Sequence, residues 1–337
     1  MEQVPVEIAE VAAERGFSGT IRVDSPDGTG WSSAYGLASR RFGIPNRPDT
    51  PFGIASGTKG LTALTVMSLI EEGVLGLATT ARSVLGADLP LISGRVTIEH
   101  LLTHRSGIGD YLGEEREGVS IDDYVLPVPV HRLESSQAYL QVLQGHPEVF
   151  PADERFEYCN GGFVVLALIA ERVAGQPFAD LVHQRVCRPA GMNATGFARG
   201  DAPPVGSAEG YVRMDGNWRA NVLHLPVLGS GDGGMYATAA DFTAFWDALF
   251  AGRIVSAPSV AAMVQARSDV PSEGRRYGMG FWLHRTSPTV MLEGLDAGIS
   301  FRSVHDPVSG RTLTTISNTA DGAWPITGAL EKHYGLD

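Results

Sequence analysis

The pattern of hydrophobic and polar positions predicts strands near both ends of the chain and helices through its middle. A first amphipathic helix is expected at residues 5–15, and residues 17–36 contain two β-rich runs around the turn-forming sequence SPDGTG, which indicates a hairpin. From about residue 276 the pattern changes towards that of strands, and a last helix is expected near 324–334. The four strand-like runs are YGMGFWLHR, TVMLEG, GISFRSVHD and RTLTTISNT.

Two helices of the middle region are apolar almost throughout, which is typical of helices buried on all sides. One begins at Ser56 and ends at Gly73, and the other has the sequence CNGGFVVLALIAERVAG and also stops at a glycine. A further helix, TAADFTAFWDALFAG, begins with Thr238 or Asp241 as its cap. The sequence shows no internal repeat and no low-complexity segment.

This order of elements predicts one domain of the mixed α/β (α+β) class over residues 1–337. We expect a sheet lobe built from residues 1–55 and 270–337, and a mainly helical lobe, residues 56–269, inserted between them. A catalytic cleft is expected between the two lobes.

Charge and composition narrow the function classes. The 38 acidic and 26 basic residues give a formal net charge of -12, which excludes nucleic acid and anionic membrane as main partners and leaves small-molecule chemistry. The start, MEQVPVEIAEVAAERG, lacks the basic and apolar regions of a secretory leader, and the longest apolar run, residues 61–70, is about half of a membrane span. We therefore expect a soluble, cytoplasmic protein, and the sequence predicts no particular oligomeric state. The two cysteines cannot form a disulfide framework.

The first apolar helix begins with an unexpected serine and lysine. Ser56 and Lys59 are three residues apart, so they share one helix face. Backbone N–H groups at the helix start would stabilise an anion beside Ser56, while burial would lower the pKa of Lys59 and let it accept the serine proton. The alternative is a serine that only caps the helix and a lysine whose amine reaches out of the core.

A second candidate element directly precedes the other apolar helix. Tyr158 could act as acid and base near Lys59, because the ammonium group would stabilise its phenolate. Asn160 could hold Lys59 in place and donate to a substrate carbonyl. The alternative is that Asn160, which precedes two glycines, only forms a turn.

The motifs together resemble those of serine β-lactamase-related proteins, a group that includes class C β-lactamases, D-alanyl-D-alanine peptidases, D-aminopeptidases and family VIII carboxylesterases. The resemblance covers about residues 17–330. It implies the β-lactamase/transpeptidase-like fold, an antiparallel sheet from both chain ends flanked by helices. The matching segments, in order, are FGIASGTKG, VTIEHLLTHRSGIGDY, FEYCNGGFVVLALIAERVAG, GMNATGF, GSGDGGMYATAADFTAFWDALF, YGMGFWL and ISNT.

The resemblance also implies roles for single residues. Ser56 would attack a carbonyl and form an acyl-enzyme, Lys59 and Tyr158 would share the proton transfers, and Asn160 would support them. The oxyanion hole would combine the N–H of the nucleophile with one from an edge strand. That strand carries the third motif of the family, whose glycine matches Gly294 and whose backbone donor falls on Leu295.

The third motif departs from the family pattern at one position. The family has a Lys or His where this chain has Leu292, so the cation that helps bind a substrate carboxylate is missing. Strand alternation would point the neighbouring Glu293 to the face opposite Leu292 and Gly294. Glu293 and Asp296 could be solvated charges or could face the cleft. A neutral ester or an amine-bearing substrate would suit such a site better than an anionic β-lactam.

Other features point to structure rather than to cofactor chemistry. His100 and His104 are spaced like metal ligands on a predicted helix, but without an H-E-x-x-H motif we expect no metal and no other cofactor. The absence of G-x-S-x-G disfavours an α/β-hydrolase. Several aromatic residues in predicted loops are candidates for lining an acyl pocket, namely Tyr111, Tyr124, Phe150, Trp218 and Trp324.

Three classes of function follow from these observations. The first is a serine hydrolase that acts on a small-molecule ester or amide through an acyl-enzyme at Ser56. The second is an acyltransferase that passes the acyl group to an alcohol or amine, and a β-lactamase or D-aminopeptidase remains a further possibility. The third is a non-catalytic ligand-binding descendant, which only Leu292 supports. The intact set of Ser56, Lys59 and Tyr158 favours the first.

Overall fold

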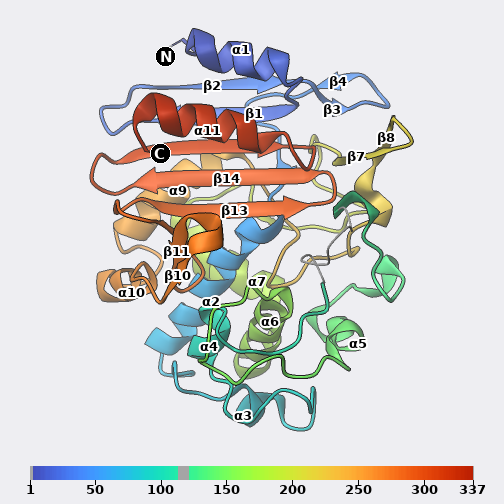
Figure 1. Cartoon of the computed structure of the whole chain (residues 1–337), viewed down its shortest axis with the longest axis vertical. Helices are drawn as coiled ribbons and strands as arrows, with labels where there is room; N and C mark the ends of the chain where they lie inside the picture. The colour runs from blue at the N-terminus through green and yellow to red at the C-terminus, as the bar shows by residue number, and fades with distance from the viewer. Residues whose placement is uncertain (1–2, 113–120, 337) are drawn as a thin grey trace.

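An eight-stranded antiparallel sheet forms the upper part of the molecule (Figure 1). The structure is a computed structural model that describes residues 3–112 and 121–336. The strands, in spatial order, are β10 (Ser268–Val270), β11 (Arg275–Tyr277), β12 (Trp282–His284), β13 (Val290–Asp296), β14 (Ile299–Asp306), β15 (Arg311–Ser317), β1 (Gly19–Asp24) and β2 (Gly30–Tyr35).

The two ends of the chain meet in this sheet. β1 pairs antiparallel with β15 along its whole length, from Gly19 opposite Ser317 to Asp24 opposite Thr312. β1 also forms the expected hairpin with β2. The sheet therefore joins the first strands of the chain to the last, as the order of the predicted elements indicated.

Two terminal helices cover the outer face of the sheet (Figure 1). These are α1 (Val6–Glu14) and α11 (Ala323–Tyr334), which pack against each other and bury Ile8 and Leu330 completely. Their apolar cluster includes Trp31 of β2 and Val304 of β14. This core is separate from the larger one beneath the sheet.

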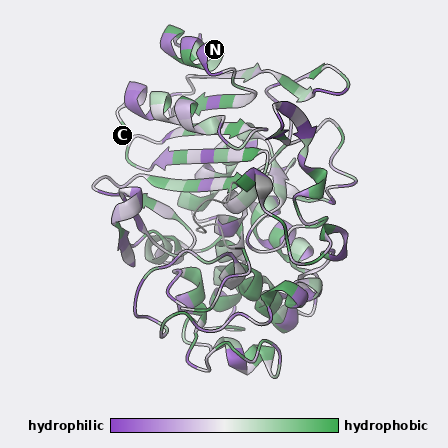
Figure 2. Ribbon diagram, turned by 45° about the vertical axis from the view of Figure 1, so that its right-hand side comes forward, coloured by the Kyte–Doolittle hydropathy of each residue, from purple (hydrophilic) through white to green (hydrophobic). Residues whose placement is uncertain are grey.

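The larger core lies in the helical lobe, where α2 and α6 are buried along most of their length. Figure 2 shows hydrophobic residues concentrated in the helices below the sheet. Because other helices and the sheet surround both, neither needs a polar face. The helices of this lobe are α2 (Thr58–Glu71), α3 (Ala81–Leu85), α4 (Ile98–Leu102), α5 (Leu140–Leu143), α6 (Asn160–Ala174), α7 (Phe178–Val182), α8 (Arg188–Ala190), α9 (Ala239–Phe250) and α10 (Ala257–Met263).

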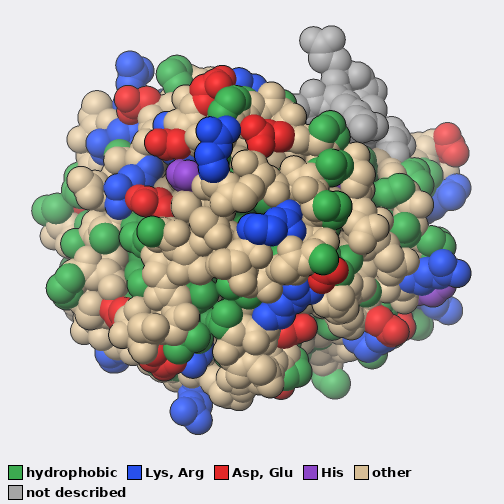
Figure 3. Space-filling view, turned by 90° about the horizontal axis from the view of Figure 1, so that it is seen from below, with side chains coloured by type: hydrophobic (Ala, Val, Ile, Leu, Met, Phe, Trp, Pro, Cys, Tyr) green, Lys and Arg blue, Asp and Glu red, His purple; other side chains and the backbone are tan. Residues whose placement is uncertain are grey.

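Short strands connect the lobes. They form three small sheets, β3 (Leu37–Ser39) with β4 (Ile44–Pro45), β5 (Phe52–Gly53) with β9 (Met235–Ala237) and β6 (Gly196–Phe197), and β7 (Tyr211–Met214) with β8 (Asn217–Ala220). The β5 strand leads directly into the segment that carries Ser56. On the face of the molecule seen from below, basic and acidic side chains are interspersed (Figure 3).

Three details differ from the expectations. Ser56 lies in a 3-10 turn, η1 (Ala55–Gly57), and α2 begins only at Thr58. The strand-like run YGMGFWLHR is interrupted because Gly280 adopts a φ of +82° and packs against α2. His104 does not lie on a helix, since α4 ends at Leu102.

In the described part of the chain, no single helix has both the length and the hydropathy that crossing a membrane requires. Among the described helices, only α6 together with the helical segment that follows it meets these two criteria, as a pair bent by 86°.

Candidate active site

Ser56 and Lys59 lie side by side where the 3-10 turn runs into α2. Lys59 is only 2% exposed, and its Nζ donates a hydrogen bond to Ser56 Oγ over 2.8 Å. The residue before the serine, Ala55, has a φ of +45°, which is rare for a residue with a side chain. Such strained backbone often occurs at functional sites.

The amine of Lys59 is held by two further acceptors from distant parts of the chain. Its Nζ donates to Asn160 Oδ1 over 2.7 Å and to the backbone oxygen of Asp232 over 2.8 Å. Asn160 is the first residue of α6, and Asp232 belongs to the GSGDGG loop. Three elements therefore fix the amine next to Ser56, and the observed position of Asn160 is the supporting one expected from the motif.

Tyr158 lies next to Lys59. The Nζ atom is 4.9 Å from the centre of the phenol ring, which is close enough for a favourable cation–π contact. The ring also packs against His104 at 4.3 Å, tilted by 32°, and stacks on Trp282 at 6.1 Å between centroids. The structure thus brings Ser56, Lys59, Tyr158 and Asn160 together, although they come from two segments about 100 residues apart in the sequence.

A buried carboxylate fixes the start of α6. Asp110 Oδ2 accepts from the backbone N–H of Asn160 over 2.7 Å, and its Oδ1 accepts from that of Gly161 over 2.8 Å. Burial raises the pKa of this carboxyl, while the two backbone bonds oppose that rise. Asp110 is therefore the cap of the helix that presents Asn160, a role that was not predicted from the sequence.

The third motif lies on β13, directly against the serine turn. A side chain on Gly294 would place its Cβ 2.1 Å from the backbone oxygen of Ile54 and 2.8 Å from the backbone nitrogen of Ser56. Only glycine allows the strand to approach so closely. Leu292 points into the core and contacts Gly60 of α2, so it fills space between strand and helix.

The acidic neighbour in this strand points the other way. Glu293 accepts from Arg275 over 2.8 Å and forms an ion pair with Arg302, whose guanidinium also reaches Glu331 of α11. Its side chain therefore lies on the outer face of the sheet, as strand alternation predicted. These arginines hold the pKa of Glu293 below its usual value despite its burial.

The register of the hairpin determines the direction of the Leu295 N–H. Asp296 pairs with Ile299 across a connection of two residues, so that pair exchanges the backbone hydrogen bonds that close the hairpin. Bonded pairs alternate with non-bonded ones, so the Leu295–Ser300 pair does not exchange such bonds. The Leu295 N–H consequently points away from β14, towards the edge on which the Ser56 turn lies.

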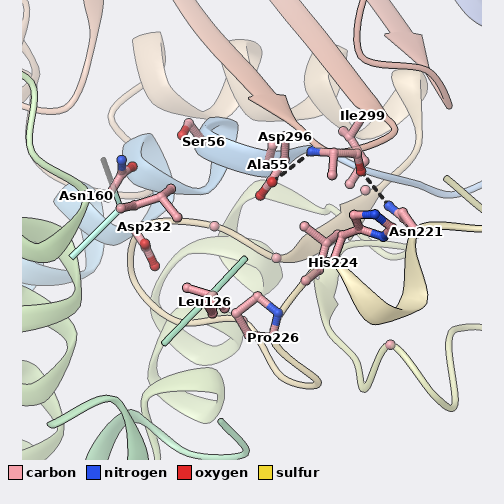
Figure 4. Close-up of a pocket in the computed structure, with 18 of the residues that line it drawn as sticks. Ala55, Ser56, Leu126, Asn160, Asn221, His224, Pro226, Asp232, Asp296 and Ile299 are labelled. Carbon is pink, nitrogen blue, oxygen red and sulfur yellow. Dashed lines mark hydrogen bonds between the residues drawn. The ribbon is translucent and has the colours of Figure 1, made fainter. Parts of the chain in front are cut away.

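A pocket opens from Ser56 between the end of the hairpin and the helical lobe (Figure 4). It encloses about 1010 Å³ of space, including its open mouth. Ser56 and Asn160 lie at one end, and the segment around Asn221 and His224 lies at the other. Tyr111 and Tyr124, two of the five aromatic residues that were candidates for an acyl pocket, line it.

The other three aromatic candidates do not line this pocket. Phe150 is buried in a loop, 5% exposed. The expectation of loop positions was wrong for Trp218, which lies in β8, and for Trp324, which lies in α11, because short elements form there.

The charged side chains that line the pocket in the described residues are acidic. Asp296 and Asp232 both face it, and none of the described lining residues is a lysine or arginine. Asp296 Oδ1 accepts from the N–H of Ala297, and Asp232 Oδ2 accepts from the hydroxyl of Tyr111 over 2.6 Å. Burial raises the pKa of Asp296 to about 7 and also raises that of Asp232.

The pocket settles one alternative left open by the sequence. Asp296 faces the cleft at the end of a strand, whereas Glu293 forms ion pairs on the outer face. In the described ranges, neither Asp232 nor Asp296 takes part in an ion pair. The role of Asp232 was not predicted, because only the folded chain brings its glycine-rich loop to Lys59.

The described residues contain no metal-ligand arrangement. No group of three or more His, Cys, Asp or Glu within residues 3–112 and 121–336 is placed to hold an ion. His100 accepts the Thr97 N–H and so helps to cap α4, while His104 lies buried beside Tyr158. The two histidines therefore have separate structural surroundings.

Comparisons with known proteins agree with this architecture. A family model described as Beta-lactamase matches residues 7–332 of the chain. The esterase EstB of Burkholderia gladioli is 30% identical over 283 residues, which are 74% of this chain and 69% of EstB. The protein PbpX of Bacillus subtilis strain 168 is 29% identical over 279 residues, and the matched region spans 82% of this chain but 64% of the length of PbpX. Among solved structures, a penicillin binding protein from Bacillus halodurans is 32% identical with a TM-score of 0.90, and the match covers 96% of this chain and 99% of that one.

Proposed function

The chain belongs to the beta-lactamase family, whose members include serine hydrolases, and on that premise we propose that it hydrolyses an ester or a small amide through an acyl-enzyme at Ser56. The observation that carries the proposal is the 2.8 Å hydrogen bond between Lys59 Nζ and Ser56 Oγ in a buried setting that opens into a pocket. A serine hydroxyl needs such a partner, because it is a weak nucleophile unaided.

The first step is attack by Ser56 on the substrate carbonyl. Ser56 Oγ forms a bond to the carbonyl carbon while its proton passes to the pair formed by Lys59 and Tyr158. That pair then returns a proton to the leaving group as the bond between the carbonyl carbon and the leaving group breaks. Water attacks the resulting ester by the reverse of these transfers, which releases the acid and restores the hydroxyl of Ser56.

Two backbone donors would stabilise the negative charge on the carbonyl oxygen. The N–H of Ser56 is one, and the outward-pointing N–H of Leu295 is the other. Gly294 allows the strand that carries the second donor to lie against the serine turn. Removal of one such donor typically lowers kcat by about 10²–10³-fold.

The charges of the pocket favour substrates without a carboxylate. Leu292 supplies no cation at the third-motif position, and the described lining carries Asp232 and Asp296 without a lysine or arginine. A carboxylate bound there would be repelled, while a neutral or amine-bearing acyl group would not. This supports an esterase or small-amide hydrolase over a β-lactamase.

Turnover of short-chain nitrophenyl esters tests the proposed function. We expect the wild type to hydrolyse them and Ser56→Ala to lose at least about 10³-fold in kcat, because no other group replaces the nucleophile. Ser309→Ala, at an exposed turn serine far from the pocket, is the matched control and should behave as wild type. Retained turnover in Ser56→Ala would refute the proposal.

A further inference from the structure

His104 contacts Tyr158 and both of its neighbours in the chain. Its ring lies 4.3 Å from the phenol ring of Tyr158, between centroids. Its Nδ1 accepts the backbone N–H of Cys159 over 3.0 Å, and its backbone oxygen accepts the N–H of Glu157 over 2.9 Å. One residue therefore holds the N–H groups of the residues before and after Tyr158 and also packs against its ring.

The conformation of His104 is unfavourable on its own. Its φ is +54°, in the left-handed region that most residues avoid, and its side chain is only 1% exposed. Its Nε2 is buried without a hydrogen-bond partner among the described residues. Strain and an unsatisfied polar atom both reduce stability, so their persistence at this position points to a role beyond packing.

The ring cannot itself serve as the acid or base. Nδ1 accepts a backbone N–H, so that nitrogen carries no proton, and burial with the nearby charge of Lys59 lowers the pKa of the imidazole well below its usual value. The imidazole is therefore neutral, and Lys59 carries the positive charge of this pair. Aromatic side chains of Phe163 and Tyr277, each 4.9 Å away, confine it further.

We propose that His104 is a positioning residue, which fixes the phenol of Tyr158 against Lys59 through its hydrogen bonds with the N–H groups of Glu157 and Cys159. The inference rests on the proposed function, in which Tyr158 takes part in proton transfer. The essential atom is the Nδ1 acceptor, because it fixes the peptide group between Tyr158 and Cys159. The backbone that carries Tyr158 is therefore held by this bond, while Asp110 holds that of Asn160.

Three variants separate the acceptor from the ring. In His104→Asn, the Oδ1 atom can take the place of Nδ1, and asparagine tolerates the left-handed backbone. In His104→Leu, a side chain of similar size cannot accept, and in His104→Phe, the ring is kept but the acceptor is lost. His100→Leu is the matched control, because His100 also accepts a backbone N–H through Nδ1, from Thr97, at a position remote from Tyr158.

The readout is kcat per active site, after the sites have been counted by complete labelling with a fluorophosphonate. We expect His104→Leu to lose roughly 10²-fold in kcat with KM changed by less than about threefold, because misplaced reacting groups affect the chemical step. His104→Asn should recover most of this loss, and His100→Leu should match the wild type. If His104→Leu does not fold, His104→Phe supplies the same comparison with the core volume kept.

Two results would overturn the inference. One is a kcat per active site in His104→Leu and His104→Phe within about threefold of wild type. The other is a loss in His104→Asn as large as that in His104→Leu, since the acceptor would then be irrelevant. Either result leaves the proposed function intact as long as the wild type is active and Ser56→Ala is not, so the two proposals fail separately.

Discussion

Three polar groups hold the buried ammonium group of Lys59 beside Ser56. Its Nζ donates to a hydroxyl, an amide oxygen and a peptide oxygen, and each of these three acceptors is uncharged. Three donated hydrogen bonds use all three N–H groups of the ammonium form of Lys59, which is the form that would stabilise a Tyr158 phenolate. The pairing of Ser56 with Lys59 followed from their spacing of three residues. The contribution of Asp232 could not be predicted, because only the folded chain brings its loop to α2.

A residue in the pocket determines which substrates the pocket prefers. We predict that a trimethylammonium acyl ester is preferred over its neutral tert-butyl isostere, and that the ratio of their kcat/KM values rises with pH as Asp296 ionises around pH 7. The catalytic groups titrate equally with both esters, so the ratio isolates the pocket. Asp296→Asn should lower the ratio at pH 8 about tenfold, a change that corresponds to roughly 1.4 kcal/mol. It should also flatten the pH dependence of the ratio.

The control for this measurement is Asp269→Asn, which removes an exposed carboxylate on β10 outside the pocket. Its ratio should equal that of the wild type. If Asp296→Asn kept the wild-type ratio and the wild-type pH dependence, this carboxylate would not select the charge of the acyl group.

At the scale of elements, the site depends on the contact between β13 and the serine turn. The two apolar helices, the terminal hairpin and the later strands were predictable, because their hydrophobic periods and their terminal glycines are local signals. The 3-10 turn at Ser56 was not, since the left-handed backbone of Ala55 has no signature in the sequence. The cap of α6 by Asp110 was also missed, because a cap 50 residues away leaves no local pattern.

Replacing the glycine of the third motif should separate the strand from the turn. In Gly294→Ala the new methyl group would overlap the backbone of Ile54, so the strand must move and the Leu295 donor with it. We expect kcat/KM to fall by at least about 10²-fold and the free energy of unfolding to fall by about 1–3 kcal/mol. Ester kinetics and urea unfolding measure the two effects.

Gly94→Ala is the matched control for this variant. Gly94 has open space around its Cβ position and no positive φ, so an added methyl group meets nothing. Activity near the wild-type level in Gly294→Ala would mean that close approach of β13 is not needed for the reaction.

At the scale of the whole molecule, the sheet lies between an outer apolar core and the candidate active site. Its outer face carries α1, α11 and their own apolar cluster (Figure 1). Ser56 and the pocket lie towards the helical lobe. The order of strands and helices predicted a sheet made from both ends, but the pairing of β1 with β15 follows only from the folded structure and from the family resemblance.

A cavity in the outer core should therefore reduce stability without changing the chemistry. Leu330 is completely buried between α11 and the sheet. Leu330→Ala should lower the free energy of unfolding by about 2–5 kcal/mol in urea, while kcat per labelled active site stays at the wild-type value. A kcat that falls along with the stability would contradict this separation.

The measurement that tests the central claim most directly is the mass of the enzyme trapped during turnover. A nitrophenyl ester is mixed with the enzyme, the reaction is stopped in acid, and the peptides are analysed by mass spectrometry. The account predicts one acyl group on the peptide that contains Ser56 in the wild type and none in Ser56→Ala. An acyl group on another residue, or turnover that continues in Ser56→Ala, would contradict it.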